Sequence, residues 1–369
     1  ESYLNMDNII SAALASGCQA IHPGFGFLSE NPDFAERTTQ AGLAFIGPTA
    51  ATIRLMGDKS EAKRNAIAAG VPVALGTDGP LRDFDEAISE AERIGYPVML
   101  KAASGGGGKG IRVALSVKDL KDAYDSAAAE AVANFGDGRL YMEKYIHNPR
   151  HIEVQILGDS LGNVVHLFER ECSVQRRHQK LIEECPSAFV TPELREKMTS
   201  AAVALAKRVG YRSAGTIEFL VDNDRNFYFC EMNTRIQVEH PVTEQVTGVD
   251  LVCEQLRIAA GEPISFKQED LVMRGHAIEC RINAEDPSRN FAPCPGTLVS
   301  LHLPGGPGVR VDSAAYQGYK IPPFYDSMIG KLIVYGSDRT QAIDRMRRAL
   351  AETLFEGVVT GTDYQMHIL

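Results

Sequence analysis

The sequence predicts a mixed α/β fold of two or three domains, on the basis of three observations. Segments with helical and strand-like patterns alternate along the chain. The 369 residues are enough to bury a large core. Of these residues, 44% are hydrophobic and 23% are charged, which is the usual composition of a globular protein. No stretch of about 18 uninterrupted apolar residues occurs, so no membrane-spanning helix is expected.

In the first half of the chain, helices are predicted where apolar residues recur at helical spacing and a glycine follows the segment. Gly17 and Gly70 end two such segments. Strands are predicted where β-branched and aromatic residues form short apolar runs. The predicted helices are 5–17 and 58–70, a Gly/Pro-rich loop occupies 20–32, and the predicted strands are 96–104, 139–145, 151–159 and 164–171.

The second half of the chain has clearer boundary signals. A helix is predicted over 191–210, with Thr191 as its N-cap, Pro192 in its first turn and Gly210 past its end. Strands are predicted over 215–222 and 227–233, and the sequence NDRN between them is typical of a turn. We therefore expect a hairpin, and the spacing predicts an amphipathic helix over 338–352.

Charge and cysteine content restrict the class of protein. The net charge is −10, so nonspecific nucleic-acid binding is not expected and any anion site needs local cations. The seven cysteines have no metal-binding spacing, and the chain carries no signal peptide or basic presequence. Reduced thiols and a cytoplasmic location are therefore expected, or a mitochondrial or plastid matrix in a eukaryote.

Three lysines and a glycine run indicate a polyphosphate site. Lys101 ends a predicted strand directly before SGGGGKG, whose N–H groups can surround an anion because no Cβ blocks close approach. Neither a Walker A motif nor a dinucleotide fingerprint is present, and a flexible hairpin is the alternative. Lys59 begins a helix, where N–H groups favour an anion. Lys144 lies beside Glu143, and on its own this pair is more typical of a solvated ion pair at a sheet edge.

Acidic residues on the predicted hairpin indicate a metal site. Glu218 lies between Ile217 and Phe219 on one strand, and Glu231 lies on the other. Two carboxylates within an apolar sheet do not both ionise unless a cation lies between them. With Asn233 they form a set of hard oxygen ligands suited to Mg²⁺. The alternatives are an exposed sheet face or a carboxylate paired with arginine.

Polar residues alternate in two further segments. In 151–159, His151, Glu153 and Gln155 share one predicted face of a strand. In EMNTRIQVEH, read as one extended segment, a single face carries Glu231, Asn233, Arg235, Gln237 and Glu239. A basic cluster is also present on this acidic protein, and it fits an anion pocket better than a nucleic-acid patch; it comprises Gln175, Arg176, Arg177, His178 and Lys180.

Several long motifs resemble the biotin carboxylase family of the ATP-grasp superfamily. They are MGDK, KAASGGGGKG, MEKY, RHIEVQILGD, ERECSVQRRHQK, EMNTRIQVEHPVTE, CRINAEDP and YDSMIGKL, and they cover nearly the whole chain. The resemblance implies an ATP-grasp domain over 48–266 with a mobile lid at about 75–145, and a biotin carboxylase C-terminal domain over 274–369. Residues 1–47 would be the remnant of a Rossmann-like N-terminal domain, whose first strand and helix are absent.

The resemblance also implies a role for each matching residue. The ATP ligands would be Lys59, Lys101, Gly107, Gly108, Glu143, Lys144, His151, Gln175 and His178, with the backbone around Tyr145 and Ile146 at the adenine. Glu218, Glu231 and Asn233 would bind Mg²⁺ or Mn²⁺. Bicarbonate would be bound by Lys180, Arg235, Gln237 and Val238. Glu239 would be the base, and Arg281 would face the ureido oxygen of biotin.

The implied reaction is carboxylation of biotin through carboxyphosphate, with ATP and bicarbonate as substrates. No biotinylation motif is present, so the implied partners are a separate biotin carboxyl carrier and a carboxyltransferase. Thr234 and Pro241 favour an acyl-CoA carboxylase such as acetyl-CoA carboxylase, and a homodimer is implied if the N-terminal domain is complete. Phe25 stands where the family often has tyrosine beside biotin. The alternatives are another ATP-grasp ligase or a truncated, non-catalytic nucleotide-binding subunit.

Overall fold

The computed structural model describes residues 2–102, 111–176 and 179–369, and the predicted α/β class is confirmed. The chain forms two compact units. Unit 1 comprises Glu1–Arg54, Ile152–Ile217 and Asn233–Leu369, and unit 2 comprises Leu55–His151 and Glu218–Met232. The predicted glycine run and His178 lie outside the described residues.

The largest sheet in the described parts of the chain has eight strands, in the order β10–β9–β6–β7–β8–β11–β16–β15. These strands are β6 (Arg150–Gly158), β7 (Val164–Arg176), β8 (Gln179–Cys185), β9 (Ser213–Val221), β10 (Phe227–Asn233), β11 (His276–Asn283), β15 (Val309–Asp312) and β16 (Met328–Gly336). The pairs from β6 through β8, β11 and β16 to β15 are antiparallel. Because β9 and β10 are neighbours, the predicted hairpin is confirmed.

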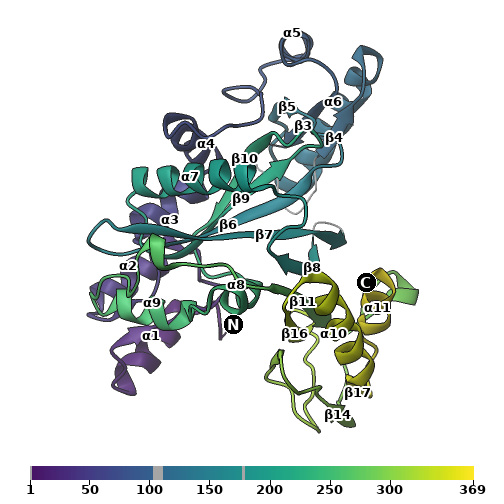
Figure 1. Ribbon diagram of the computed structural model, residues 1–369. Helices are drawn as coiled ribbons and strands as arrows, with labels where there is room; N and C mark the ends of the chain where they lie inside the picture. Colours follow the sequence, from purple (N-terminus) through teal and green to yellow (C-terminus); the bar gives the residue numbers. More distant parts are fainter. Residues whose placement is uncertain (1, 103–110, 177–178) are drawn as a thin grey trace. The chain divides into compact units, whose positions relative to one another are not determined.

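Unit 2 has its own three-stranded antiparallel sheet, in the order β4–β3–β5. Its elements are α4 (Lys59–Ala68), α5 (Phe84–Ile94), α6 (Val117–Phe135), β3 (Val98–Ala102), β4 (Ile111–Ala114) and β5 (Leu140–Lys144). Leu100 and Met142 on the sheet pack with Ala91 of α5 and Leu120 of α6, and all four are fully buried. Figure 1 shows both helices beside this sheet. Asp58 caps α4, because its carboxylate accepts from the N–H groups of the first turn.

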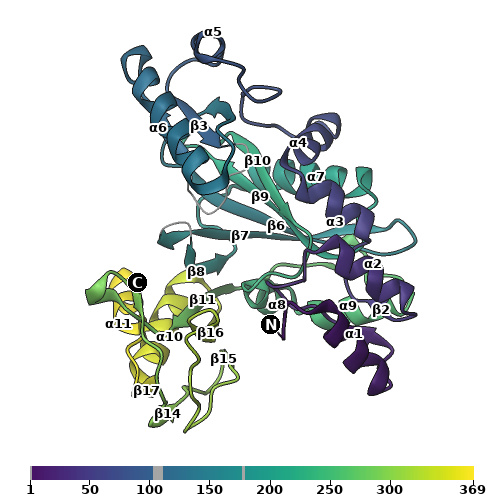
Figure 2. The same ribbon diagram turned by 180° about the vertical axis from the view of Figure 1, so that it is seen from behind.

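The N-terminal part of unit 1 has a small core of its own. Its elements are α1 (Met6–Ala15), β1 (Ala20–Ile21), α2 (Pro32–Gln40), β2 (Ala44–Phe45) and α3 (Ala50–Gly57). The strands β1 and β2 pair in parallel. Ile10 of α1, Phe34 of α2 and Ile53 of α3 lie in one buried cluster. These helices are seen most clearly in Figure 2.

The remaining helices of unit 1 cover its strands. They are α7 (Pro192–Arg208), α8 (His240–Thr247), α9 (Leu251–Ala259), α10 (Arg339–Glu352) and α11 (Thr362–Ile368), with 3-10 turns at Gln268–Asp270 and Pro287–Arg289. Short strands pair as β12 (Glu285–Asp286) with β13 (Ala292–Pro293) and β14 (Ser300–His302) with β17 (Leu354–Glu356). Met346 of α10 packs with Leu332 of β16 and Cys280 of β11. Thr191 caps α7 as predicted.

The prediction that EMNTRIQVEH forms one extended strand is wrong. β10 ends at Asn233, and α8 begins at His240 with Pro241 in its first turn. The backbone N–H of Thr234 donates to a carboxylate oxygen of Glu30 at 3.0 Å. Proline cannot continue a strand ladder but suits the first turn of a helix. The side chains from Arg235 to Glu239 therefore come from a bend and not from one face of a sheet.

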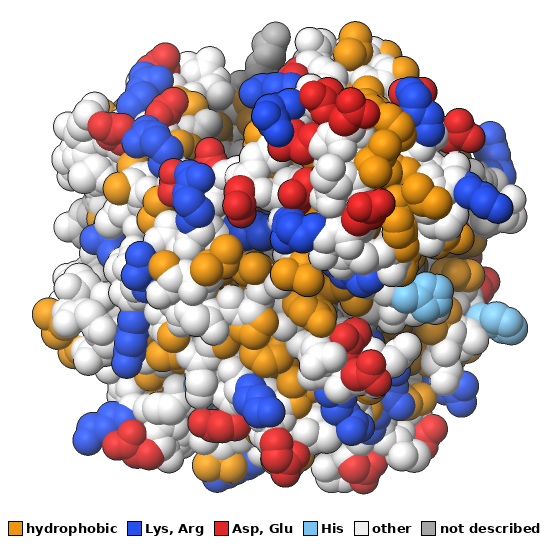
Figure 3. All heavy atoms as spheres, turned by 90° about the horizontal axis from the view of Figure 1, so that it is seen from above, with side chains coloured by type: hydrophobic (Ala, Val, Ile, Leu, Met, Phe, Trp, Pro, Cys, Tyr) orange, Lys and Arg blue, Asp and Glu red, His pale blue; other side chains and the backbone are white. Residues whose placement is uncertain are grey.

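Acidic and basic side chains are interspersed on the molecular face seen in Figure 3. The net charge is −10, so anion binding at this surface would depend on local groups of lysine and arginine. Among the residues that the structure describes, no helix is long and apolar enough to cross a membrane.

Candidate active site

Two lysines of unit 2 bind the same carboxylate. Lys101 at the end of β3 donates to Glu143 of β5, with Nζ 2.5 Å from Oε2. Lys63 of α4 approaches the other oxygen, with Nζ 3.6 Å from Oε1. Burial alone would raise the pKa of Glu143, but the ammonium groups of Lys101 and Lys63 hold it below its usual range. Glu143 is therefore an anion that fixes both ammonium groups.

The other predicted nucleotide residues of unit 2 lie on element ends. Lys59 is exposed in the first turn of α4. The ammonium of Lys144, at the end of β5, donates to the carbonyl oxygens of Gly95 and Tyr96, each at 2.8 Å. These carbonyls follow α5, whose C-terminal partial charge is negative. Tyr145 and Ile146 follow β5 directly and are half-buried.

The carboxylates predicted to bind a metal have different surroundings. Glu218 on β9 is buried, and its Oε2 lies 2.8 Å from Nε2 of His151. Glu231 on the neighbouring strand β10 is exposed. Asn233, at the end of β10, belongs to unit 1, and its Oδ1 accepts from Nη2 of Arg235 at 3.0 Å. Carboxylate and amide oxygens are the donor types that Mg²⁺ or Mn²⁺ requires, so each of these side chains is chemically suited to a hard divalent cation.

Unit 1 contains a row of alternating charges, which we call the charged row. Lys180 of β8 donates from Nζ to Glu239 Oε1 at 2.6 Å, and Arg281 of β11 donates from Nη2 to Glu239 Oε2 at 2.9 Å. Lys180 Nζ also lies 2.5 Å from Glu153 Oε2. The order of the row is Arg170, Glu153, Lys180, Glu239, Arg281 and Glu183. Lys180 and Arg281 therefore each lie between two carboxylates.

Burial and charge set opposite pKa shifts within this row. Burial would raise the pKa of Glu239, but Lys180 and Arg281 hold it well below its usual range. Burial raises the pKa of Glu183 to about 7, although Arg281 opposes the shift. Glu239 is thus ionised at neutral pH, whereas burial favours the protonated form of Glu183.

The bend after β10 holds the remaining predicted anion ligands in place. Arg235 donates from Nε to Glu30 Oε2 at 2.9 Å. Gln237 accepts from Arg170 Nη2 at 2.6 Å through Oε1. The carbonyl oxygen of Val238 accepts from Lys331 Nζ at 2.8 Å. Arg235, Gln237 and Val238 are therefore each bonded to a charged side chain from another part of the chain.

Sequence reasoning missed four residues of this site: Glu30, Arg170, Glu183 and Lys331. Arg170 and Glu183 are fully buried on β7 and β8, but both strands carry several other charged residues, so no hydrophobic pattern singles these two out. The predicted common face of Glu153 and Gln155 is confirmed, because Arg170 binds both side chains.

Of the remaining predicted nucleotide residues, one lies in the described part of the chain and three do not. Gln175 on β7 donates from Nε2 to the carbonyl oxygen of Cys172 at 2.8 Å. Gly107, Gly108 and His178 lie outside the described residues.

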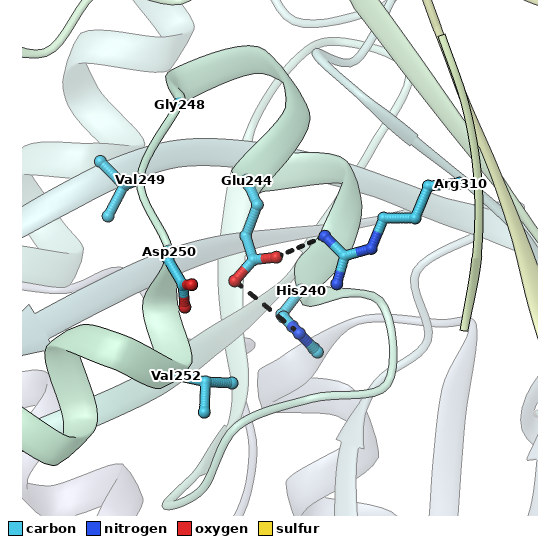
Figure 4. Close-up of a pocket in the computed structure, with 7 residues that line it drawn as sticks. All are labelled: His240, Glu244, Gly248, Val249, Asp250, Val252 and Arg310. Carbon is cyan, nitrogen blue, oxygen red and sulfur yellow. Dashed lines mark hydrogen bonds and ion pairs between the residues drawn. The ribbon is translucent and has the colours of Figure 1, made fainter. Parts of the chain in front are cut away.

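A separate cavity of about 440 Å³ lies in unit 1, beside the start of α8. Its lining residues are His240, Glu244, Gly248, Val249, Asp250, Val252 and Arg310. Figure 4 shows the Glu244 carboxylate between Arg310 and His240; Arg310 Nη1 donates to Glu244 Oε2 at 2.6 Å. Burial lowers the pKa of His240 to about 3. None of these residues was predicted to be functional.

Three family models match successive parts of the chain. They are the biotin carboxylase N-terminal domain at residues 1–53, the ATP binding domain of the carbamoyl-phosphate synthase L chain at 58–267, and the biotin carboxylase C-terminal domain at 279–369. Together they contain every predicted site residue.

Similar proteins carry more than one name. The chain is 56% identical to a biotin carboxylase of Nostoc sp., over all of this chain and 83% of that protein. It is 55% identical to a pyruvate carboxylase subunit of Methanothermobacter thermautotrophicus, over all of this chain and 75% of that one. The biotin carboxylase domain of Hydrogenobacter thermophilus 2-oxoglutarate carboxylase, solved as a dimer with MgADP, ADP and bicarbonate, superposes with a TM-score of 0.92 at 53% identity. That match covers 99% of this chain and 81% of the other.

Proposed function

The chain belongs to the biotin carboxylase family of ATP-grasp enzymes, and we propose that it carboxylates biotin on a carrier protein with ATP and bicarbonate. The reaction is a ligation that forms a C–N bond. The observation that supports it most is the Glu239 carboxylate, held between Lys180 and Arg281 in a buried site. Such a site offers both a base and cations for an anionic substrate.

Unit 2 carries most of the proposed nucleotide ligands. Lys59, Lys101 and Lys144 supply positive charge, and Glu143 fixes Lys101. Lys144 is bonded to the carbonyl oxygens of Gly95 and Tyr96, and the backbone of Tyr145 and Ile146 that follows it would meet the adenine. His151 and Gln175 complete the described part of the set. We assign Glu218, Glu231 and Asn233 as the residues that would hold Mg²⁺ or Mn²⁺, which would neutralise phosphate charge.

Unit 1 carries the bicarbonate ligands. Arg235 and Lys180 supply positive charge, Gln237 supplies amide N–H groups, and the backbone of Val238 borders the anion. Lys180 is paired with Glu239. Bicarbonate competes with Glu239 for Lys180, and the loss of one cation raises the pKa of Glu239 toward neutrality, where a base is most effective.

The chemistry then proceeds in three steps. Glu239 takes the proton of bicarbonate, and a bicarbonate oxygen attacks the γ-phosphorus of ATP, which releases ADP and leaves carboxyphosphate. Carboxyphosphate breaks its C–O bond and gives CO₂ and phosphate, and the phosphate takes the N1 proton of biotin. Biotin N1 then bonds to CO₂ while Arg281 stabilises the negative ureido oxygen.

The final acceptor, to which the carboxyl group passes from biotin, is selected by the carboxyltransferase. A biotin carboxyl carrier and a carboxyltransferase are the proposed partners, and a homodimer is the proposed assembly. Thr234 and Pro241 favour an acyl-CoA acceptor such as acetyl-CoA. That assignment remains a prediction, because a relative named biotin carboxylase and one named for pyruvate carboxylase are almost equally similar.

The test is ATP hydrolysis by the purified chain, measured without additions, with bicarbonate, and with bicarbonate and free biotin. We expect hydrolysis that depends on bicarbonate and increases with biotin, together with carboxybiotin formation. Hydrolysis driven by an amine or carboxylate substrate instead would favour another ATP-grasp ligase. Nucleotide binding without hydrolysis under every condition would favour a non-catalytic protein.

A further inference from the structure

Arg170 is a fully buried arginine in the middle of β7, beside the residues to which we assign bicarbonate binding. All five of its N–H donors are bonded to side chains. Nε donates to Glu153 Oε1 (2.6 Å), Nη1 to Gln155 Oε1 (2.6 Å) and Thr243 Oγ1 (3.0 Å), and Nη2 to Thr216 Oγ1 (3.1 Å) and Gln237 Oε1 (2.6 Å). A guanidinium has five N–H donors, so none remains for a substrate.

The bond to Gln237 determines which way its amide faces. A guanidinium donates hydrogen bonds and cannot accept them, so only the amide oxygen of Gln237 can face Arg170. The amide NH₂ must then point away from Arg170. Gln155 obeys the same rule, because its oxygen faces Arg170 and its Nε2 donates to the carbonyl oxygen of Gly215 at 3.0 Å. The Gln237 amide therefore has one orientation rather than two.

The bond to Glu153 has a consequence at the other end of the charged row. Glu153 is fully buried and uses Oε1 for Arg170 and Oε2 for Lys180. Lys180 in turn bonds to Glu239. Without Arg170, the buried Glu153 carboxylate would lose its permanent cation and would draw more strongly on Lys180. Arg170 thus contributes to the position of both Lys180 and Gln237.

We propose that Arg170 is a positioning residue for bicarbonate, which turns the Gln237 NH₂ toward the anion and keeps Lys180 in place to bind it. This inference rests on the proposed function, because it assigns Gln237 and Lys180 to bicarbonate. Arg170 itself touches no reacting atom. A purely structural role predicts lower stability and a lower amount of active enzyme, whereas a positioning role predicts weaker bicarbonate binding in the enzyme that remains folded.

The test is the R170K variant, assayed for bicarbonate-dependent ATP hydrolysis in the full chain. Lysine keeps the charge but offers three donors in place of five. We expect the KM for bicarbonate to rise by about 10- to 100-fold, the range for losing a hydrogen bond to a charged group. The KM for ATP should change by less than about threefold. Equal increases in both KM values, or no increase in either, would overturn the proposal.

R195K is the matched control. Arg195 of α7 makes a two-pronged bond with Glu169, the residue before Arg170 on β7, at 2.7 Å for both contacts. The substitution damages one partly buried ion pair on the same strand without touching the charged row. We expect lower thermal stability and an unchanged KM for bicarbonate. A bicarbonate effect as large as that of R170K would show that any loss of packing at β7 disturbs the site.

A double-mutant cycle separates positioning from general disruption. If Arg170 acts in part through Gln237, then the effects of R170K and Q237A on the bicarbonate KM should be less than additive. Fully additive effects would overturn the proposal. Should R170K be insoluble, T216V takes its place in the cycle, because it removes one acceptor of Arg170 and no assigned ligand. Absence of bicarbonate-dependent hydrolysis in the unsubstituted chain would count against the proposed function instead.

Discussion

Glu239 is a carboxylate whose base strength depends on what its two cations bind. Lys180 and Arg281 hold its pKa well below the usual range even though it is buried. A carboxylate stabilised in this way is a weak base, since the same interactions that favour ionisation oppose protonation. Binding of an anion to Lys180 would therefore raise the pKa of Glu239, so that Glu239 becomes a stronger base only when substrate is present.

For this reason, E239Q should lower bicarbonate-dependent ATP hydrolysis by at least about 100-fold, the usual lower range for loss of a general base. Binding of an ATP analogue, measured by calorimetry, should be nearly unchanged. E184Q is a suitable control, because Glu184 is bonded to His276 and Arg339 and lies outside the charged row. Turnover in E239Q close to that of the unsubstituted enzyme would exclude Glu239 as the base.

His240, next to Glu239, gives the protein a sensitivity to acid. Its Nδ1 lies 2.8 Å from the carbonyl oxygen of Gln237, and burial lowers its pKa to about 3. The unfolded chain takes up a proton at His240 below about pH 6.5, whereas the folded chain does not. The folded state therefore loses stability as pH falls from about 6.5 toward 3.

H240N should reduce this loss, because asparagine can keep the donor to Gln237 and does not titrate. Between pH 7 and pH 5, the unfolding free energy should fall by up to about 2 kcal/mol less than in the unsubstituted protein. Urea denaturation at the two pH values measures the difference. Parallel pH dependence in both proteins would mean that other groups cause the acid sensitivity.

At the scale of elements, the turn from β10 into α8 contributes more to the proposed anion site than either element does. β10 ends at Asn233, and the carboxylate of Glu30 accepts from the backbone of Thr234 and from Arg235. A single side chain from the N-terminal segment thus both ends the strand and orients a guanidinium. The conformation of the bend therefore depends on Glu30 as well as on residues 234–239.

Accordingly, E30Q should weaken bicarbonate binding selectively. Glutamine can still accept from the Thr234 N–H, but it replaces the ion pair with Arg235 by a neutral hydrogen bond. We expect a roughly 3- to 30-fold higher KM for bicarbonate, as for a partly exposed charged hydrogen bond. The KM for ATP should be unaffected, and E36Q on the neighbouring helix serves as the control. A larger effect on ATP than on bicarbonate would contradict this assignment.

The helices and strands could be predicted from the sequence, whereas the hydrogen bonds and ion pairs within the site could not. Thr191, Pro192 and Gly210 define α7 through local preferences, and the hairpin of β9 and β10 follows from its turn residues. Alternation alone was misleading after Asn233, because Pro241 and a contact 204 residues distant decide the backbone there. The partners of Arg170 lie up to 73 positions away, and no local pattern encodes such a set.

At the scale of the whole molecule, the net charge of −10 opposes the binding of a polyphosphate. Glu218 and Glu231, on neighbouring strands of unit 2, add to this repulsion locally. Part of the positive charge of the lysines in unit 2 is also neutralised, since Lys101 is bonded to Glu143. A divalent cation should therefore strengthen nucleotide binding.

Chelation should consequently abolish most of the stabilisation by nucleotide. A non-hydrolysable ATP analogue with Mg²⁺, at about 100 times its Kd, should stabilise the protein by about 2.7 kcal/mol. For a chain of this size, the shift in Tm is roughly 3 °C. With EDTA the shift should nearly vanish, and Ca²⁺ provides a comparison cation in a thermal-shift assay. An equal shift in EDTA would show that the lysines alone bind the nucleotide.

The contact of Glu30 with the bend after β10 limits how this enzyme can be divided. The region that matches an ATP binding domain, residues 58–267, contains Arg235, Gln237 and Glu239. It excludes Glu30, which holds Arg235, and it excludes Arg281 and Lys331, which hold Glu239 and Val238. A fragment of that region would keep the side chains to which we assign bicarbonate binding and proton transfer, and it would lose the groups that position them. Modules exchanged between related enzymes should therefore be cut outside all three matched regions.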